Sequence, residues 1–319
     1  MMIKTFNILL IFLVFLFSLG GCKKHKEARV NGTDPAELIV EDLVYISDKS
    51  GSFDIYRNTL HGQKESRITS ATGWEWFPQY VPAKNIVVYN SMDTTGVFRT
   101  MAMSLKGDTI VNFPKLSLPE IRISDEGRWI AYVRQKNKDT SNILIAPLYR
   151  LGDSLQVTHD EGYNGRPVWS PDSKNLAFIS DRTGTNEVYL FDMQTKQVRR
   201  VTKNNKREKY MSWRPDGKLL GVTMENERGI NDIYVIDFKN QRTERLTDTP
   251  YSEEEIRWSD SGDKIAYHSK IDDRDDIYVL KLKSDTLAID SIWKVTDSKA
   301  YYGEPEWICT DSCRSRLNK

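Results

Sequence analysis

The sequence predicts an all-β fold, a six-bladed β-propeller built from four-stranded blades. From Leu43 onward, short runs rich in Val, Ile, Tyr and Phe alternate with Gly, Asp, Asn and Pro turns, and no amphipathic helical stretch interrupts them. The pattern repeats about every 45 residues, the usual length of a propeller blade. The first repeat lacks an opening strand, and the end of the chain supplies one. A closed ring of blades accounts for all three observations.

Three series of residues define the repeat, which is clearest between Pro167 and Thr202. A large residue ends the first strand of each unit, at intervals of 43 to 49 residues: Tyr80, Ile123, Trp169, Trp213, Trp258 and Trp307. The third strand carries a second series: Tyr56, Phe98, Leu144, Tyr189, Tyr234 and Tyr278. The fourth strand ends on an aliphatic residue and a threonine: Ile68-Thr69, Val157-Thr158, Val201-Thr202, Leu246-Thr247 and Val295-Thr296. Because the three series stay in phase, chance is excluded.

The turn after the first strand also has a structural explanation. Pro171 and Pro215 fix φ for a turn, and the aspartates that follow them can accept backbone N–H groups. The tryptophans that precede these turns are large and apolar. We therefore expect them to pack between neighbouring blades rather than to contact a ligand.

The two ends of the chain are expected to share one blade. Residues 43–69 contain a second, a third and a fourth strand but no first strand, and the segment from Glu304 to Ile308 has the pattern of a first strand. Pairing them leaves no open sheet edge. The propeller is expected to occupy residues 38–313 with no second domain, and residues 314–319 form a tail.

The N-terminal residues 1–21 predict a lipoprotein signal peptide. Lys4 precedes an apolar run ending at Leu19, which is too short to span a bilayer comfortably. Leu19 and two glycines before Cys22 resemble a bacterial lipobox, which implies cleavage before Cys22 and acylation of its thiol. An ordinary signal peptide with an incidental cysteine is the alternative. Residues 22–37 are polar and basic, so we expect a flexible tether that leaves the domain anchored to the lipid bilayer.

Composition and motifs limit the function classes. Lys and Arg total 46 against 45 Asp and Glu, so no overall field attracts nucleic acid, and we expect a monomer that binds none. The sequence contains no Gly-x-Ser-x-Gly elbow, no His-Glu-x-x-His motif, no phosphate loop and no Cys-x-x-Cys pair. We therefore assign no catalytic residue and do not expect an enzyme.

No metal or cofactor is expected, with one minor alternative. The four histidines are not spaced as a metal pair. Asp272, Asp273, Asp275 and Asp276 could offer carboxylate oxygens to Ca²⁺ in one loop. However, Asp276 occupies the repeat position that other units also fill with an acidic residue, so a structural role is favoured.

Two cysteines, Cys309 and Cys313, follow the last strand. In an oxidising envelope a disulfide between them would hold the closing strand in place. Two free thiols are the alternative.

Aromatic residues recur in the connections between blades, which end at the mouth of the central channel. The candidate binding face consists of these aromatics and one arginine: Trp74, Trp76, Tyr163, Arg166, Tyr210, Tyr251, Tyr301 and Tyr302. Exposed aromatics among charged residues, here including Glu253 and Glu304, are typical of a binding surface. The alternative is that they pack on one another and plug the channel.

The repeats resemble those of a known family. WSPDSKNLAFIS, WRPDGKLLGVT and WSDSGDKIAYHS, each followed by a D-I-Y or E-V-Y strand, are similar to the propeller of TolB and, more broadly, to the WD-like repeats of prolyl oligopeptidase relatives. The resemblance covers nearly all of the mature chain. It implies a non-enzymatic protein of the cell envelope whose propeller binds an envelope protein or peptide. From the resemblance together with the lipobox-like motif at Cys22, we expect a lipoprotein at the outer membrane facing the periplasm.

The sequence departs from TolB in two ways: it shows no N-terminal α/β domain, and it carries a lipid-anchor motif. The TolB role therefore cannot be transferred whole. A propeller that binds or cleaves a carbohydrate is the alternative, because carbohydrate sites also use aromatic platforms beside carboxylates.

Overall fold

The computed structural model describes residues 41–309 except 61–63, 71, 110–115, 117, 119, 285 and 298. The chain divides into two units, Met1–Leu38 and Ile39–Lys319, and the described residues belong to the second. The predicted signal peptide, the tether, Cys22 and Cys313 lie outside the described residues.

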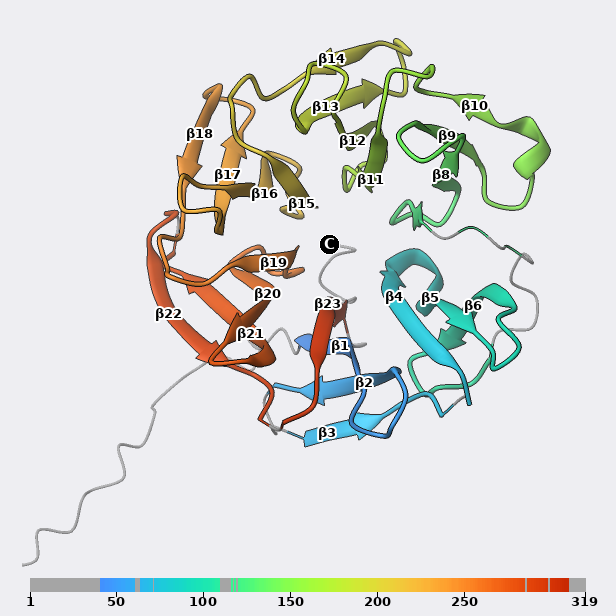
Figure 1. Ribbon diagram of the computed structural model, residues 1–319, viewed down its shortest axis with the longest axis vertical. Helices are drawn as coiled ribbons and strands as arrows, with labels where there is room; N and C mark the ends of the chain where they lie inside the picture. The colour runs from blue at the N-terminus through green and yellow to red at the C-terminus, as the bar shows by residue number, and fades with distance from the viewer. Residues whose placement is uncertain are drawn as a thin grey trace, which may run out of the picture. The chain divides into compact units, whose positions relative to one another are not determined.

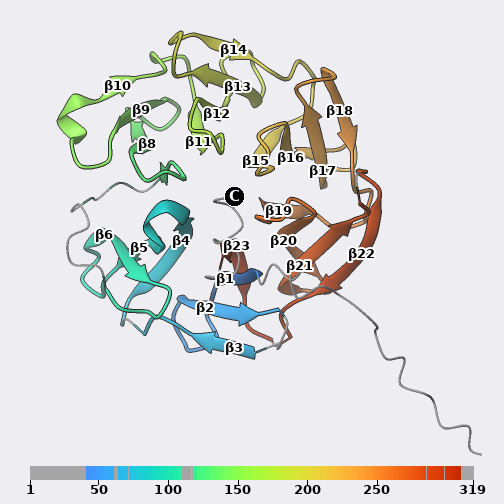
Figure 2. The ribbon, with the colours of Figure 1, turned by 180° about the vertical axis from the view of Figure 1, so that it is seen from behind.

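Six antiparallel sheets surround a central axis (Figures 1 and 2). The blades are numbered along the chain, and the strands of each blade are named from the centre outward. Blade 1 contains β23 (Tyr302–Cys309), β1 (Glu41–Ser47), β2 (Asp54–Thr59) and β3 (Lys64–Arg67); blade 2 contains β4 (Trp74–Val81), β5 (Ile86–Met92) and β6 (Phe98–Ser104). Blade 3 contains β7 (Ile121–Ile123), β8 (Trp129–Gln135), β9 (Ser141–Pro147) and β10 (Leu155–Gln156).

The remaining three blades follow the same plan. Blade 4 contains β11 (Asn164–Trp169), β12 (Asn175–Ser180), β13 (Glu187–Asp192) and β14 (Val198–Arg200); blade 5 contains β15 (Glu208–Trp213), β16 (Leu219–Glu225), β17 (Asn231–Asp237) and β18 (Arg242–Arg245). Blade 6 contains β19 (Glu253–Trp258), β20 (Lys264–Ile271), β21 (Arg274–Leu282) and β22 (Ile289–Lys294). The described residues otherwise form only two 3₁₀ turns, η1 (Pro82–Lys84) and η2 (Leu151–Asp153). The predicted all-β, six-bladed propeller is confirmed.

Blade 2 differs slightly from the expected four strands. Its sheet has three strands in the described part of the chain, and two isolated antiparallel bridges, Met103–Thr109 and Thr100–Leu116, extend the outer edge of β6.

The closing blade joins the two ends of the propeller as predicted. β23 pairs antiparallel with β1, with Trp307 opposite Leu43 and Cys309 opposite Glu41. Figure 1 shows β23 as the innermost strand of the blade that also holds β1, β2 and β3. The edge that β1 would otherwise expose towards the centre is therefore covered.

The threonine at the end of the fourth strand fixes the start of the third strand. In blade 5, the Ile233 N–H donates to Thr247 Oγ1 at 2.8 Å, and Asp232, which is fully buried, pairs with Arg245 at 2.7 Å. Both contacts recur in blades 1 and 4. In blade 1 they are made by Thr69 and by the ion pair Asp54–Arg67, and in blade 4 by Thr202 and by the ion pair Glu187–Arg200. A buried polar group must be hydrogen-bonded, so this network explains why the acidic residue and the threonine recur together.

The large residues at the ends of the inner strands join neighbouring blades. The indole N–H of Trp169 donates to the carbonyl of Arg122 in blade 3 at 3.0 Å. The indole N–H of Trp307 donates to the carbonyl of Arg257 in blade 6 at 2.9 Å. Both rings are buried in hydrophobic clusters that draw on two blades. The predicted packing of these tryptophans between blades is confirmed.

Candidate binding site at the mouth of the central channel

A β-bulge recurs in the inner strands. In blades 1, 2, 4, 5 and 6 the register between the innermost strand and its neighbour shifts by an inserted residue. Four bulges hold a residue other than glycine at positive φ: Phe77, Arg166, Glu255 and Glu304, with φ of 53° to 55°. Such backbone is uncommon for these residue types, and bulges redirect side chains. The inner strands are therefore built to aim one side chain per blade.

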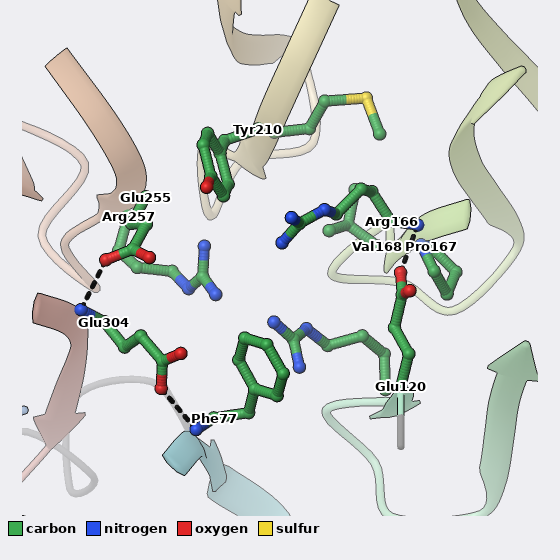
Figure 3. Close-up of a pocket in the computed structure, with 11 residues that line it drawn as sticks. Phe77, Glu120, Arg166, Pro167, Val168, Tyr210, Glu255, Arg257 and Glu304 are labelled. Atoms are coloured by element: carbon green, nitrogen blue, oxygen red, sulfur yellow. Dashed lines mark hydrogen bonds between the residues drawn. The ribbon is translucent and has the colours of Figure 1, made fainter. Parts of the chain in front are cut away.

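These side chains meet in one pocket, which we call the mouth pocket. Each blade contributes the residue three positions before its large residue: Phe77, Glu120, Arg166, Tyr210, Glu255 and Glu304. Arg122 and Arg257, two positions further along their strands, complete the polar lining. The pocket comprises about 520 Å³ of empty space, part of it open to solvent, and lies where the inner strands begin, at the end of the channel that receives the connections between blades. Figure 3 shows the labelled residues arranged around it.

The glutamates of the mouth pocket hold neighbouring blades together. Glu255 Oε2 accepts the backbone N–H of Glu304 at 2.6 Å. The Glu304 carboxylate accepts the N–H of Phe77 in the next blade, and the Glu120 carboxylate accepts that of Arg166 (Figure 3). Burial, together with the nearby charge of Glu255, raises the pKa of Glu304 to about 8. Burial therefore favours the protonated form of this carboxyl.

The arginines of the mouth pocket are paired unevenly. Arg257 Nε donates to Glu306 Oε2 at 2.8 Å. Arg122 donates to the carbonyl of Ile121 at 2.9 Å, while the guanidinium of Arg166 lies 4.6 Å from the centre of the Tyr210 ring. Among the ion pairs of the described residues, none involves Arg122 or Arg166.

Arg122 lies in an unfavourable electrostatic position. Burial and then the like charge of Arg257 lower the pKa of Arg122 to about 10. It remains a cation at neutral pH, so the floor of the mouth pocket holds a guanidinium group that no carboxylate of the described residues pairs with.

A second pocket, the far pocket, opens at the other end of the channel, where the Pro-Asp turns lie. It comprises about 790 Å³ of empty space, part of it open to solvent, and its lining includes Asp125 and Asp260. Burial, and after it the charge of nearby carboxylates, raises the pKa of both aspartates to about 7. Arg122 and Arg257 line both pockets, so the two meet at this pair of guanidinium groups.

The structure places the predicted binding-face residues in several environments. Arg166 and Tyr210 line the mouth pocket. Trp74 is 55 % exposed and makes an edge contact with Phe53, which also contacts Tyr301 at a ring distance of 5.4 Å. Phe53, Trp74, Tyr301 and His268 form a continuous aromatic rim, and His268 lies 3.9 Å from Glu255 of the mouth pocket.

Two of the predicted tyrosines cover glycines of their own strands. A Cβ on Gly165 would lie 2.3 Å from the Tyr163 hydroxyl, and one on Gly303 would lie 2.4 Å from the Tyr301 hydroxyl. Only glycine permits so close an approach. Tyr163 and Tyr301 therefore contribute to packing as well as to the surface.

Other members of the predicted face are not exposed as expected. Tyr302 is 1 % exposed and packs edge-on against Tyr45, so its expected exposure is wrong. Glu253, expected among the surrounding charges, is likewise buried. Trp76 is half-buried against Phe98, and Tyr251 is half-buried. The reason is that β19 and β23 begin at Glu253 and Tyr302, so strand alternation turns these first residues into the interblade core.

Among the lining residues of the mouth pocket that were not predicted from the sequence are Phe77, Glu120, Arg122, Glu255 and Arg257. The signal that could have found the six inner residues is the position three residues before each large residue. The prediction rested instead on the aromatics that recur six or seven residues before the large residue, because the inner position itself is aromatic in only two blades.

The structure gives calcium no support. Among the described residues, no group of three or more His, Cys, Asp or Glu side chains could hold a metal ion. Asp276 is buried, and the Thr296 hydroxyl donates to its Oδ1 at 2.8 Å, so it serves the repeat network. Cys309 is buried at the end of β23 and is disulfide-bonded, while Cys313 lies outside the described residues, so the pairing of these two cysteines stays a prediction.

Comparisons with known proteins agree with this architecture. The family model described as the TolB beta propeller domain matches residues 110–225. A TolB homolog of Chlorobium luteolum is 26 % identical over 166 residues, 50 % of this chain and 36 % of that protein. An uncharacterized peptidase of Bacillus subtilis, YuxL, is 33 % identical over 115 residues, 34 % of this chain and 17 % of that protein. This chain thus spans well under half of either relative.

Among solved structures, TolB from Acinetobacter baumannii superposes with a TM-score of 0.67 at 16 % identity, covering 83 % of this chain and 66 % of that one. At this identity the likeness concerns the fold. The chain contains a TolB-like six-bladed β-propeller. Within the part of the chain that the structure describes, no helix has the length and apolar character needed to cross a membrane.

Proposed function

We propose that this chain is a non-enzymatic lipoprotein of the cell envelope, anchored through acylated Cys22, whose propeller binds a protein or peptide at the mouth pocket and the adjacent aromatic rim. Outer-membrane attachment facing the periplasm, a monomeric state and the absence of a cofactor are parts of this proposal. The lipobox-like N-terminus supports the anchor, and the TolB-like propeller supports the envelope location.

One observation carries the binding proposal: each blade directs one side chain into the same pocket, and together these are three glutamates, one arginine, one phenylalanine and one tyrosine. Phe77 and Tyr210 offer apolar surface, Arg166 offers hydrogen-bond donors, and the glutamates offer acceptors. Binding sites combine an apolar lining with a few well-placed polar groups in this way. The exposed Trp74 lies in the aromatic rim beside the pocket, and partly exposed aromatics are frequent anchors of protein interfaces.

Affinity capture from an envelope extract tests the proposal. The acylated protein, the variant Tyr210→Ser with Trp74→Ser, and the control variant Leu155→Ser are compared as baits. Leu155 is a similarly exposed hydrophobic residue, 39 % accessible, on the outermost strand of blade 3. We expect a specific partner to be lost from the double variant and retained by the control. A partner retained equally by all three baits would place the binding site elsewhere.

A glycan-binding or glycan-cleaving propeller is the second candidate, and one observation favours it. Glu304, with a pKa of about 8, lies beside Glu255 in the same pocket, and a protonated carboxyl next to a second carboxylate is the combination that glycoside hydrolysis uses. However, both groups already accept backbone N–H donors. A glycan array followed by product analysis separates the candidates, because only the second predicts glycan binding, and, for a cleaving propeller, product formation that is lost in Glu304→Gln.

A further inference from the structure

We propose that the mouth pocket recognises a carboxylate of its peptide partner, held between the guanidinium groups of Arg166 and Arg122. The inference rests on the proposed protein-binding function and names the chemical group that the pocket selects. Neither arginine forms an ion pair with a carboxylate of the described residues.

The two arginines have few hydrogen-bond acceptors of their own. Arg166 stacks on Tyr210 and hydrogen-bonds with the Tyr163 side chain. Arg122 donates to the carbonyl of Ile121. A guanidinium group has five N–H donors arranged to meet a carboxylate in pairs, so both groups retain donors for a ligand. Figure 3 shows the side chain of Arg166 extending from β11 towards the centre of the pocket.

The glutamates of the pocket form no ion pair with Arg122 or Arg166, although the charges of Glu120 and Glu255 help to raise the pKa of Arg166. Glu120 and Glu304 are held at the wall by the backbone N–H groups of Arg166 and Phe77, and Glu255 by that of Glu304 (Figure 3). Burial favours the uncharged form of Glu304, which reduces the repulsion that an incoming carboxylate would meet.

The charges around Arg122 only partly offset one another. Glu306 is paired with Arg257 at 2.8 Å, and the like charge of Arg257, after burial, lowers the pKa of Arg122, while the charges of Glu306 and Glu120 act in the opposite direction. A ligand carboxylate near Arg122 would offset this like-charge repulsion. An amide or a hydroxyl would not, because neither carries a negative charge.

The surroundings of the pocket favour a peptide as the source. One side chain from each of the six blades lines it, and a carboxylate side chain or a chain terminus that enters it would meet Arg166 and Arg122 in its lining. The aromatic rim beside it offers Trp74 and Phe53 to apolar residues that flank that group. A peptide with an acidic residue between apolar residues meets both requirements.

Binding of three N-acetylated pentapeptides tests the inference. The first has glutamate between two phenylalanines and an amidated terminus. The second replaces the glutamate with glutamine, and the third is the glutamine peptide with a free terminal carboxylate. We expect the glutamate peptide, the free-terminus peptide or both to bind at least about tenfold more tightly than the amidated glutamine peptide, since charge-assisted hydrogen bonds to arginine are strong. The arm that shows the preference identifies the carboxylate source as side chain or chain terminus.

Variants then connect this preference to the pocket. Arg166→Gln should remove it, and Arg166→Lys, which keeps the charge but not the paired donors, should retain part of it. If Arg166→Gln unfolds, Arg122→Gln takes its place in the comparison. Arg128→Gln is the matched control, because its side chain is 73 % exposed at the turn between β7 and β8, at the opposite end of the channel.

Equal affinity for all three peptides, or no measurable binding of any, would overturn the carboxylate proposal, as would an unchanged preference in Arg166→Gln. The affinity-capture experiment distinguishes this failure from that of the proposed function. If Tyr210 and Trp74 still control capture, protein binding at the mouth stands while carboxylate recognition fails.

Discussion

Replacing Trp307 by alanine tests whether the last strand is as integral to the propeller as any internal one. The Trp307 ring is 3 % exposed, and its indole N–H donates to the Arg257 carbonyl at 2.9 Å. Truncating a buried tryptophan costs about 3–5 kcal/mol, and leaving a buried carbonyl without its donor adds about 1 kcal/mol or more. We therefore expect the free energy of unfolding to fall by about 4–6 kcal/mol, a large part of a domain's total of about 5–15 kcal/mol.

Trp169→Ala is the matched internal control. Trp169 occupies the same position in blade 4, is 6 % exposed, and makes the same kind of bond to the Arg122 carbonyl at 3.0 Å. Because the environments match, the two substitutions should destabilise the protein equally, within about 1 kcal/mol. Trp74→Ala, at a ring that is 55 % exposed, should change stability by less than about 1 kcal/mol.

Urea unfolding followed by circular dichroism measures all three variants, with the slope of the transition showing whether each unfolds as a single unit. If Trp307→Ala loses less than half of what Trp169→Ala loses, the closing strand is not a full member of its blade. Truncation after Ala300 gives a second measurement. It removes all of β23 and uncovers the edge of β1, so we expect aggregation or a large fall in Tm.

Three further predictions concern pH, anchoring and the face opposite the mouth. Three buried glutamates lie in the innermost strands of their blades: Glu75, Glu208 and Glu253. Burial is the main reason why the pKa of each rises from its ordinary value of 4.5 to about 7. The folded state retains these protons where the unfolded chain releases them, so unfolding free energy should fall as pH rises from 4.5 to 7, by up to about 3 kcal/mol per group, and then level off. Glu253→Gln should flatten this profile in urea unfolding at pH 5 and pH 8, and a stability that rises between them would contradict the assignment. Cys22→Ser should abolish metabolic palmitate labelling and leave an uncleaved precursor or an unanchored form, and unchanged labelling would remove the lipid anchor. Charge reversal at Lys174 and Lys218 beside the Pro-Asp turns should leave partner capture unchanged, and its loss would move the binding site to the far pocket.

Much of the fold was predictable because its determinants are local and repeated. Alternating strand residues, the Pro171 turn, the Trp169 position and the Thr202 position recur in phase, so each repeat indicates its own four-stranded unit. The closure was predictable for the same reason: Trp307 falls on the repeat after Trp258, and the first repeat lacks the strand that holds this position.

The candidate site was predicted only in part. Arg166 and Tyr210 were selected and do line the mouth pocket. Tyr302 was selected for its aromatic ring, but the strand that it begins turns this ring into the core. The sequence does not show which side of a strand start faces the channel, because a bulge changes the alternation that would otherwise decide it.

The sequence by itself determined the blade, the number of blades and the manner of closure, since each follows from strand alternation and from spacings within about 45 residues. Only the tertiary structure decided which side chains share the mouth pocket. The six inner residues include only one shared type, glutamate, in three blades: Phe77, Glu120, Arg166, Tyr210, Glu255 and Glu304. They come together because ring closure brings the same repeat position of six blades to one pocket. That no carboxylate of the described residues pairs with Arg122 or Arg166 is likewise a property of distances between blades, which no spacing along the chain encodes.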